Sequence, residues 1–167
     1  DRSQDGGRTW VRSDEWQIDK TVIAGDGAIQ PTLWESSPGK VHAFVRTAAG
    51  FVGRVDSADG GRTWSPVQKT DLPNNNSGLD VLKLDAERLL LVYNPVGKNW
   101  GSRSPLNVAL STDNGATWTD LAALEDEPEM EFSYPAIVRT SKGIAISYTW
   151  KRERVRVWQI PLNAIAP

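Results

Sequence analysis

The 167-residue sequence contains no cysteine, one histidine and one methionine. Without cysteine there is no disulfide, no thiolate metal ligand and no cysteine nucleophile. No run of apolar residues approaches the roughly 18 that a membrane-spanning helix needs, and no signal peptide is recognisable. Paired carboxylates, Walker-type loops and clusters of metal ligands are missing as well. No cofactor, metal or membrane span is therefore expected.

A predominance of charge of one sign is also absent. The sequence has 19 basic and 21 acidic residues, interspersed along the chain, and a net charge of −2. Nucleic-acid binding requires a clearly basic face, so nucleic acid is not an expected partner. No helical period of 3.6 holds over ten residues except weakly at 119–126, a segment too short to count.

One eight-residue stretch, by contrast, occurs three times. Its shared pattern is S-x-D-x-G-x-T-W, and its copies lie at 3–10, 57–64 and 111–118. Successive copies begin 54 residues apart. Five fixed positions repeated at one period indicate tandem structural units. We refer to these three stretches as boxes 1, 2 and 3.

Each residue type in the boxes suits a tight turn between strands. The aspartates can accept hydrogen bonds from nearby backbone N–H groups, as in Asx turns, and the glycines can take the positive φ that such a turn needs. The tryptophans (Trp10, Trp64 and Trp118) are large enough to fill the gap between packed sheets. The boxes are therefore predicted to be structural rather than binding sites.

Between the boxes, short apolar or alternating segments favour strands. The predicted strands are 16–18, 32–34, 41–45, 51–55, 79–84, 89–93, 106–110, 135–139, 144–148 and 154–160. Repeats of this length with four short strands each are typical of propeller blades. The sequence predicts an all-β fold of about three four-stranded blades, with residues 1–167 as one partial β-propeller domain. A three-repeat β-array of another kind is the alternative.

Three blades do not close a ring, because propellers usually have four to eight. Either the chain is part of a longer one, or two copies associate into a ring of six blades.

The three boxes resemble the Asp-box (BNR) repeats of sialidases, also called neuraminidases, and the resemblance extends over nearly the whole sequence. It implies the C-terminal half of a six-bladed β-propeller and an exo-acting glycoside hydrolase that removes a terminal acidic sugar such as sialic acid. It also implies boxes at the rim and an active site at the centre, with three arginines, a nucleophilic tyrosine, an activating glutamate and an aspartate acid/base. A sialidase-like protein would be secreted or periplasmic; the sequence itself does not fix the compartment.

Three of these site residues have counterparts at matching spacings. The family tyrosine opens the last blade nine residues before a turn glycine, and Tyr134 stands nine residues before Gly143. One family arginine lies eight residues before the serine of the last box, as Arg103 does here. Another lies seven residues past a turn glycine, as Arg46 does after Gly39. The resemblance implies that Tyr134 is the nucleophile and that Arg46 and Arg103 bind the substrate carboxylate.

The sequence departs from the family at the glutamate. Gln30, followed by Pro31, occupies its place 16 residues before Arg46. An amide can hydrogen-bond a tyrosine hydroxyl but cannot accept its proton. Glu35 and Asp80, on predicted inner strands, are the candidates for a replacement base. The family's first arginine and its aspartate belong to blades that this sequence does not contain.

Several other polar or aromatic residues can be interpreted as structural. The acidic run at 125–131 is predicted to be a solvated loop next to Tyr134, and His42 is predicted to be structural. The polar segment 74–78 and Trp100 could contact a sugar, although ordinary turn chemistry accounts for them as well.

Two functions are consistent with these features. The first is a sialidase-like hydrolase, whose partners are a glycan with a carboxylate and the missing blades or a second copy of the chain. The second is a carbohydrate-binding or scaffold propeller that has lost catalysis, which the glutamine at position 30 favours.

Overall fold

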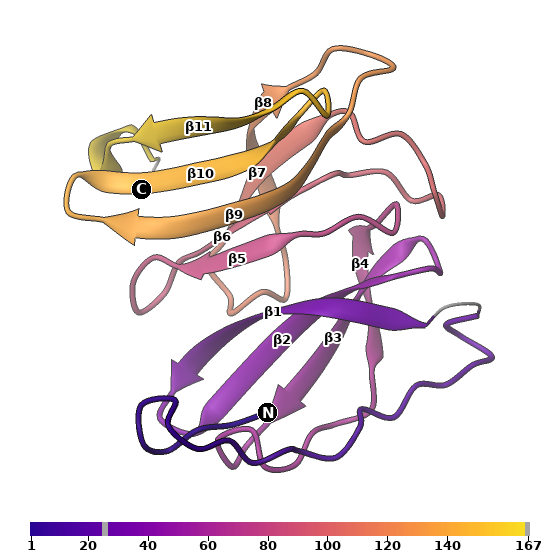
Figure 1. Ribbon diagram of the computed structural model, residues 1–167, viewed down its shortest axis with the longest axis vertical. Coiled ribbons are helices and arrows are strands. Elements are labelled where there is room, and N and C mark those ends of the chain that lie inside the picture. The colour runs from indigo at the N-terminus through magenta and orange to yellow at the C-terminus, as the bar shows by residue number, and fades with distance from the viewer. Residues whose placement is uncertain (25–26, 166–167) are drawn as a thin grey trace.

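The computed structural model describes residues 1–24 and 27–165, which form three antiparallel sheets and no α-helix (Figure 1). The first sheet contains β1 (Ala28–Ser37), β2 (Lys40–Thr47), β3 (Phe51–Ser57) and β4 (Gln68–Pro73). The second contains β5 (Asp80–Lys83), β6 (Leu89–Tyr93), β7 (Leu106–Ser111) and β8 (Thr119–Glu125). The third contains β9 (Phe132–Thr140), β10 (Gly143–Trp150) and β11 (Arg154–Ile160), followed by the 3₁₀ turn η1 (Leu162–Ala164).

Each sheet is a simple meander in which neighbours along the chain pair antiparallel. The first strands of the three sheets, β1, β5 and β9, lie side by side with β5 in the middle (Figure 1). This is the arrangement of successive propeller blades, whose innermost strands surround a common centre. The all-β prediction is confirmed.

Some details differ from the sequence prediction. The third sheet has three strands among the described residues, whereas the first two have four. Residues 16–18 form no strand, and a single backbone bond, from Val67 N to Gln17 O at 2.9 Å, ties this segment to the first sheet. The weakly helical stretch at 119–126 lies largely in strand β8, because pairing with β7 satisfies its backbone.

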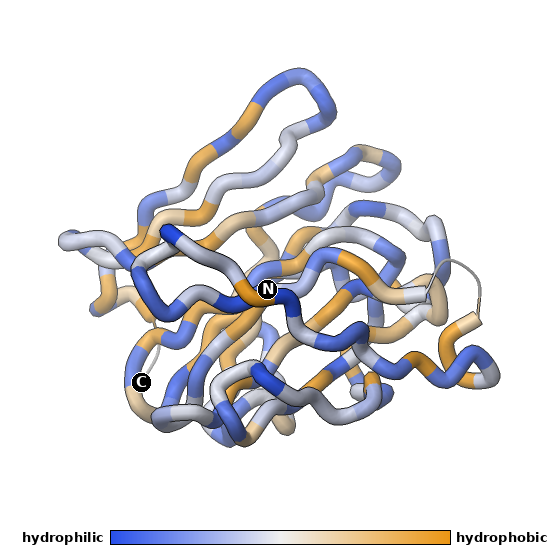
Figure 2. Tube along the Cα trace, turned by 60° about the horizontal axis from the view of Figure 1, so that its bottom comes forward, coloured by the Kyte–Doolittle hydropathy of each residue, from blue (hydrophilic) through white to orange (hydrophobic). Residues whose placement is uncertain are grey.

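Apolar side chains fill the spaces between the sheets. One cluster joins the second and third sheets around Leu90, Leu106 and Tyr148, and another joins the first and second around Trp34 and Leu91. Hydrophobic and hydrophilic residues are interspersed along the chain, and many of the outlying turns are hydrophilic (Figure 2). None of the helical segments in the described part of the chain has the length and apolarity to cross a membrane.

The boxes form turns that share one set of hydrogen bonds. In box 3, Asp113 Oδ1 accepts from Thr117 N at 2.8 Å, and Oδ2 accepts from Thr117 Oγ1 at 2.6 Å. Ser111 Oγ accepts from Gly115 N at 2.9 Å. The same bonds recur in boxes 1 and 2. Each carboxylate thus satisfies N–H groups that the turn would otherwise leave unpaired.

The box tryptophans do not share one environment. Trp118 packs 5.9 Å from the ring of Phe44 in the first sheet, and Trp64 lies 5.3 Å from Trp16. Trp10 is 63% exposed, so the prediction that all three fill gaps between sheets is wrong for box 1. Among the described residues, box 1 precedes the first sheet and has no sheet of its own to pack against.

Box 3 is also joined to the first sheet through Asn114. Its Oδ1 accepts from Trp34 Nε1 at 2.8 Å, and its backbone O accepts from Arg54 Nη1 at 3.1 Å. Its amide nitrogen lies 3.2 Å from His42 Nε2, and His42 Nδ1 lies 2.5 Å from Asp56 Oδ1. His42 therefore takes part in contacts between sheets, in agreement with its structural reading.

The turn bonds predict an acid-sensitive contribution to stability. They lower the pKa of Asp113 from 3.8 to about 2, chiefly through the Thr117 hydroxyl and N–H. A folded-state pKa below the unfolded one stabilises the protein above the unfolded value, and this gain is lost as pH falls through the folded value. Asp113→Asn is expected to lower the free energy of unfolding by about 1 kcal/mol at pH 7, the usual size for a solvent-exposed bond. Wild type and variant are expected to converge near pH 2.

Urea unfolding across the acid range measures this difference. Asp71→Asn, which changes an exposed carboxylate on β4, is the matched control. A difference between wild type and Asp113→Asn that does not vary with pH would contradict the assignment.

Candidate functional site

The site lies where the first strands of the blades begin. Gln30 in β1 and Tyr134 in β9 hold equivalent places, each followed by a proline. Both residues have positive φ, 54° for Gln30 and 52° for Tyr134. This region is sparsely populated by residues with a side chain, and a following proline normally favours extended backbone. Strained backbone of this kind concentrates at functional sites, where it aims particular side chains.

Between these two residues lies Gly78, shortly before β5, which has no side chain. A Cβ atom at Gly78 would lie 3.2 Å from Tyr134 Cδ1 and 3.9 Å from Gln30 Oε1. The distance from such a methyl group to the tyrosine ring would be shorter than an ordinary van der Waals contact. The glycine therefore makes room for the tyrosine ring, and the three blade entrances converge on it.

Arg46 reaches this point from the end of β2. It is 8% exposed; Nη1 donates to Gln30 Oε1 at 2.6 Å and Nε donates to Asn76 Oδ1 at 3.1 Å. The buried Asn76 in turn donates to Asn99 Oδ1 at 3.1 Å. One residue of the polar segment 74–78, Asn76, thus holds Arg46 in place.

Arg103 approaches Tyr134 from the loop between β6 and β7. Its guanidinium carbon lies 4.9 Å from the centre of the Tyr134 ring. Nη1 donates to Glu131 Oε1 at 3.2 Å and to Ser133 Oγ at 3.4 Å. The Arg103 side chain is 11% exposed, so this cation is largely removed from water. An arginine held in this way offers its remaining N–H groups to an anion.

The two arginines change the acidity of Tyr134. Hydrogen bonding to Arg103 is the largest cause of a lowered pKa; burial opposes it, and the charge of Arg103 and the contact with Arg46 add to the lowering. The other tyrosines behave in the opposite way. Burial and the nearby Asp120 raise the pKa of Tyr93, and burial and the Glu125 hydrogen bond raise that of Tyr148 to about 12. Tyr134 is the most readily ionised phenol of the chain, and it is 44% exposed.

The structure brings the four residues singled out from the sequence, Gln30, Arg46, Arg103 and Tyr134, into one site. An open cavity of about 570 Å³ adjoins Tyr134 and extends towards the β10–β11 turn. No group of three or more potential metal ligands occurs among residues 1–24 and 27–165.

The two candidates for a replacement base are engaged elsewhere in the fold. Asp80 Oδ1 accepts from Thr32 Oγ1 at 2.6 Å, and its Oδ2 accepts from Ile137 N at 2.8 Å. Glu35 Oε1 accepts from Gly39 N at 2.6 Å in the β1–β2 turn. These hydrogen bonds of both carboxylates are with donors of the scaffold and none is with Tyr134, so these contacts do not support either as its base.

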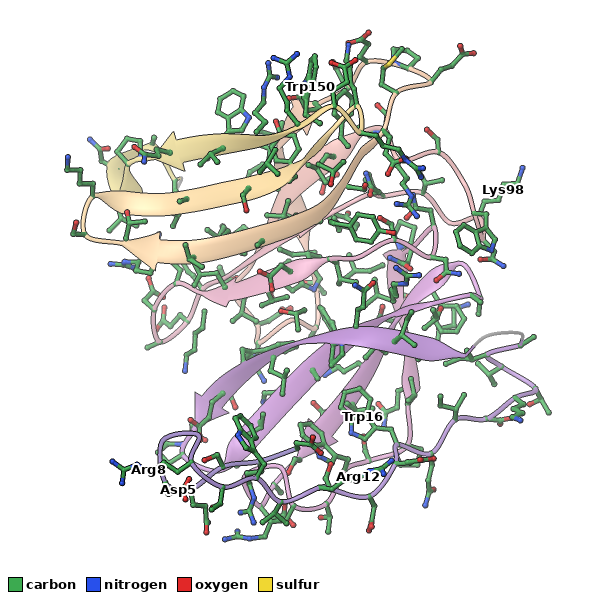
Figure 3. The ribbon with its side chains drawn as sticks, viewed as in Figure 1. Asp5, Arg8, Arg12, Trp16, Lys98 and Trp150 are labelled. Carbon is green, nitrogen blue, oxygen red and sulfur yellow. The ribbon has the colours of Figure 1, made fainter. Side chains whose placement is uncertain are left out.

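The acidic run at 125–131 is not a freely solvated loop. Three of its glutamates form ion pairs with the β10–β11 hairpin, whose Trp150 is labelled in Figure 3. The pairs are Glu125–Arg156, Glu127–Lys151 and Glu131–Arg152. Glu131 is the site residue that sequence reasoning missed. Its place three residues before Tyr134 was the available signal, but a run of acidic residues ordinarily indicates a solvated surface.

The sequence is similar to known proteins along most of its length. The BNR repeat-like domain matches residues 1–146. The curated anhydrosialidase of Macrobdella decora is 23% identical over 177 residues, which cover 95% of this chain and 23% of that protein.

Solved structures show the same fold. The Hadza microbial sialidase Hz136 has a TM-score of 0.76 at 20% identity, over 98% of this chain and 32% of that one. The NanB sialidase of Streptococcus pneumoniae has a TM-score of 0.66 at 20% identity, over 93% of this chain and 25% of that one. The partial β-propeller prediction is thereby confirmed, and the chain spans a third or less of the length of these relatives.

Proposed function

Because the chain belongs to the BNR repeat-like domain family, we propose that it is part of a sialidase-like glycoside hydrolase. Its substrate is a glycan that ends in a sugar with a carboxylate, such as sialic acid. The resemblance to sialidases and to an anhydrosialidase supports this class of reaction. Residues 1–167 act in it as one partial propeller domain.

The observation that carries the proposal is the convergence of two arginines, one buried and one largely enclosed, on one tyrosine. Arg103 lies over the Tyr134 ring, and Arg46 is bonded to Gln30, which flanks Gly78 opposite the tyrosine. Both arginines also lower the pKa of Tyr134. Other side chains orient each guanidinium group by accepting some of its N–H hydrogen bonds. Gln30 and Asn76 accept from Arg46, and Glu131 and Ser133 accept from Arg103. The N–H groups that remain can grip a carboxylate by charge-assisted hydrogen bonds.

A tyrosine suits attack on such a sugar. The anomeric carbon of sialic acid carries a carboxylate, which repels an anionic carboxylate nucleophile, whereas a neutral phenol avoids this repulsion; sialidases use a tyrosine for this step. As the bond to carbon forms, the bond from that carbon to the leaving oxygen breaks, and the phenol passes its proton to water that reaches the exposed Tyr134, since Gln30 cannot accept it. The two guanidinium groups favour this loss. By the resemblance, an aspartate acid/base and a further arginine come from blades outside this sequence.

Removing either arginine is expected to weaken binding of a sialic acid glycoside by roughly 10- to 100-fold, the worth of one charged hydrogen-bonded pair. Titration calorimetry of Arg46→Met and Arg103→Met with methyl α-sialoside measures this. Arg8→Met is the matched control, because Arg8 is exposed in box 1 at the edge of the molecule (Figure 3). Unchanged affinity in both site variants, or no binding by the wild-type protein, would remove the proposal.

A non-catalytic carbohydrate-binding propeller is the second candidate, and Gln30 favours it. Its Oε1 accepts from Arg46 at 2.6 Å, a contact suited to holding the arginine rather than to taking a proton. This candidate predicts arginine-dependent binding of the sialoside with no turnover, and no turnover in Gln30→Glu.

A further inference from the structure

Glu131 is the only acidic residue among the described hydrogen-bond partners of the two site arginines. Its Oε1 accepts from Arg103 Nη1 at 3.2 Å and from Ser133 Oγ at 2.9 Å. Its Oε2 accepts from Arg152 Nε at 2.5 Å. The Glu131 side chain is 20% exposed, so both of its oxygens are used in a largely enclosed position. A carboxylate with this many partners fixes the groups around it.

The contacts of Glu131 connect the hairpin with the tyrosine. The exposed Arg152, in the β10–β11 turn, forms an ion pair with Glu131. Glu131 forms a second ion pair with the largely enclosed Arg103. Arg103 then lies 4.9 Å over the Tyr134 ring. Ser133, on the strand that carries Tyr134, donates to Glu131 and accepts from Arg103. The Glu131 carboxylate therefore binds both Arg103 and the residue next to Tyr134.

Glu131 is charged at neutral pH. Burial alone would raise its pKa, but the Arg152 and Ser133 hydrogen bonds and the charge of Arg103 outweigh burial and lower it. The charge of Glu131 could therefore act on Tyr134 in two opposite ways. It could offset the positive charge of Arg103 at the phenol, or it could keep Arg103 in contact with the phenol.

We propose that Glu131 is a positioning residue, anchored by Arg152, that holds Arg103 against Tyr134, and that the β10–β11 hairpin is thereby part of the active site. The reason is geometric: Glu131 binds Nη1 of Arg103, while Arg103 has no other acidic partner among the described residues. Without this contact the long arginine side chain regains its rotamer freedom, which favours its leaving the ring. The role in the reaction rests on the proposed function, but the contact can be tested without substrate.

Tyrosinate absorbance during alkaline titration provides the test. The chain has three tyrosines, and the other two have raised pKa values, so the first phenol to ionise reports on Tyr134. Positioning predicts that Glu131→Ala raises the pKa of Tyr134 towards its ordinary value of 10, as Arg103→Met does. The double variant is then expected to titrate like Arg103→Met alone. Arg152→Ala is expected to raise it by a smaller amount, because Ser133 still holds Glu131.

Matched variants separate charge from position. Glu129→Gln removes a charge from the same loop at an exposed residue and is expected to leave the titration unchanged. Glu131→Gln keeps the size and one acceptor oxygen, and is expected to lie between wild type and Glu131→Ala. An unchanged or lowered Tyr134 pKa in Glu131→Ala would overturn the proposal, because it would make Glu131 a bystander or only an opposing charge. Should Glu131→Ala fail to fold, the same comparison is made with Glu131→Gln.

Binding of methyl α-sialoside distinguishes this inference from the proposed function. Glu131→Ala is expected to weaken binding about tenfold and Glu129→Gln to leave it unchanged. A raised Tyr134 pKa with no sialoside binding even in the wild type would uphold the contact and reject the sialidase-like role. Normal binding with an unchanged Tyr134 pKa would reject the contact and uphold the role.

Discussion

Replacing Tyr134 by phenylalanine is expected to abolish sialoside hydrolysis, with kcat falling on the order of a thousandfold or more, because the attacking oxygen is removed. The affinity for the sugar is expected to change little, since Arg46 and Arg103 remain and the ring keeps its place beside Gly78. Turnover of a fluorogenic sialoside and calorimetric binding, measured on the protein that carries this chain, give the two quantities separately.

Two comparisons accompany this variant. Tyr93→Phe removes a buried phenol bonded to Asp120 in the second sheet and is expected to leave kcat unchanged. Gln30→Glu places a carboxylate in contact with Arg46 near the tyrosine and is expected to raise turnover by roughly 100-fold, the lower range for a general base. Undiminished hydrolysis by Tyr134→Phe would exclude the tyrosine as the nucleophile.

Replacing Asp80 by alanine is expected to lower the free energy of unfolding by about 3 kcal/mol, which is a factor of more than 100 in the folded-to-unfolded ratio. Asp80 links three blades: it accepts from Thr32 in β1 and from Ile137 N in β9, and it begins β5. Its loss leaves two donors without partners at the junction of the sheets. Urea unfolding monitored by tryptophan fluorescence measures the effect.

Asp71→Ala, which removes an exposed aspartate from β4, is the control and is expected to change stability by less than about 0.5 kcal/mol. Asp80→Asn keeps an acceptor oxygen for Thr32 and is expected to retain part of the stability. Equal stability of Asp80→Ala and Asp71→Ala would mean that the contact between sheets adds nothing.

The sequence predicted the fold through its repeated boxes and its strand periodicity. The 54-residue spacing defined the units, and the alternation of 51–55 and the continuous apolar run at 89–93 indicated strands. The third sheet departs from the predicted four-stranded blade, because the described residues supply only three strands for it. Trp10 is exposed for a related reason, since box 1 lacks the sheet surface that Trp118 covers.

The candidate site was predictable only as far as spacing along the chain determines it. The resemblance to sialidases identified the four residues that the structure brings together, by matching family spacings from turn glycines, from box 3 and from Arg46, while their chemical roles stay predictions. The positive φ of Gln30 and Tyr134 was not predictable, because the residue before a proline is ordinarily extended. Glu131 was missed because its partners, Arg103 and Arg152, lie 28 and 21 residues away in sequence.

Asn114 gives the third box an identity that the other two lack. The corresponding residues of boxes 1 and 2 are Gly6 and Gly60, which have no side chain to offer a neighbour. Only box 3 can therefore accept from Trp34 and approach His42. Proteins built from near-identical repeats can fold with the wrong units docked together. A single residue in an otherwise common turn thus gives the third box side-chain contacts with its neighbour that the glycines of its near copies cannot make.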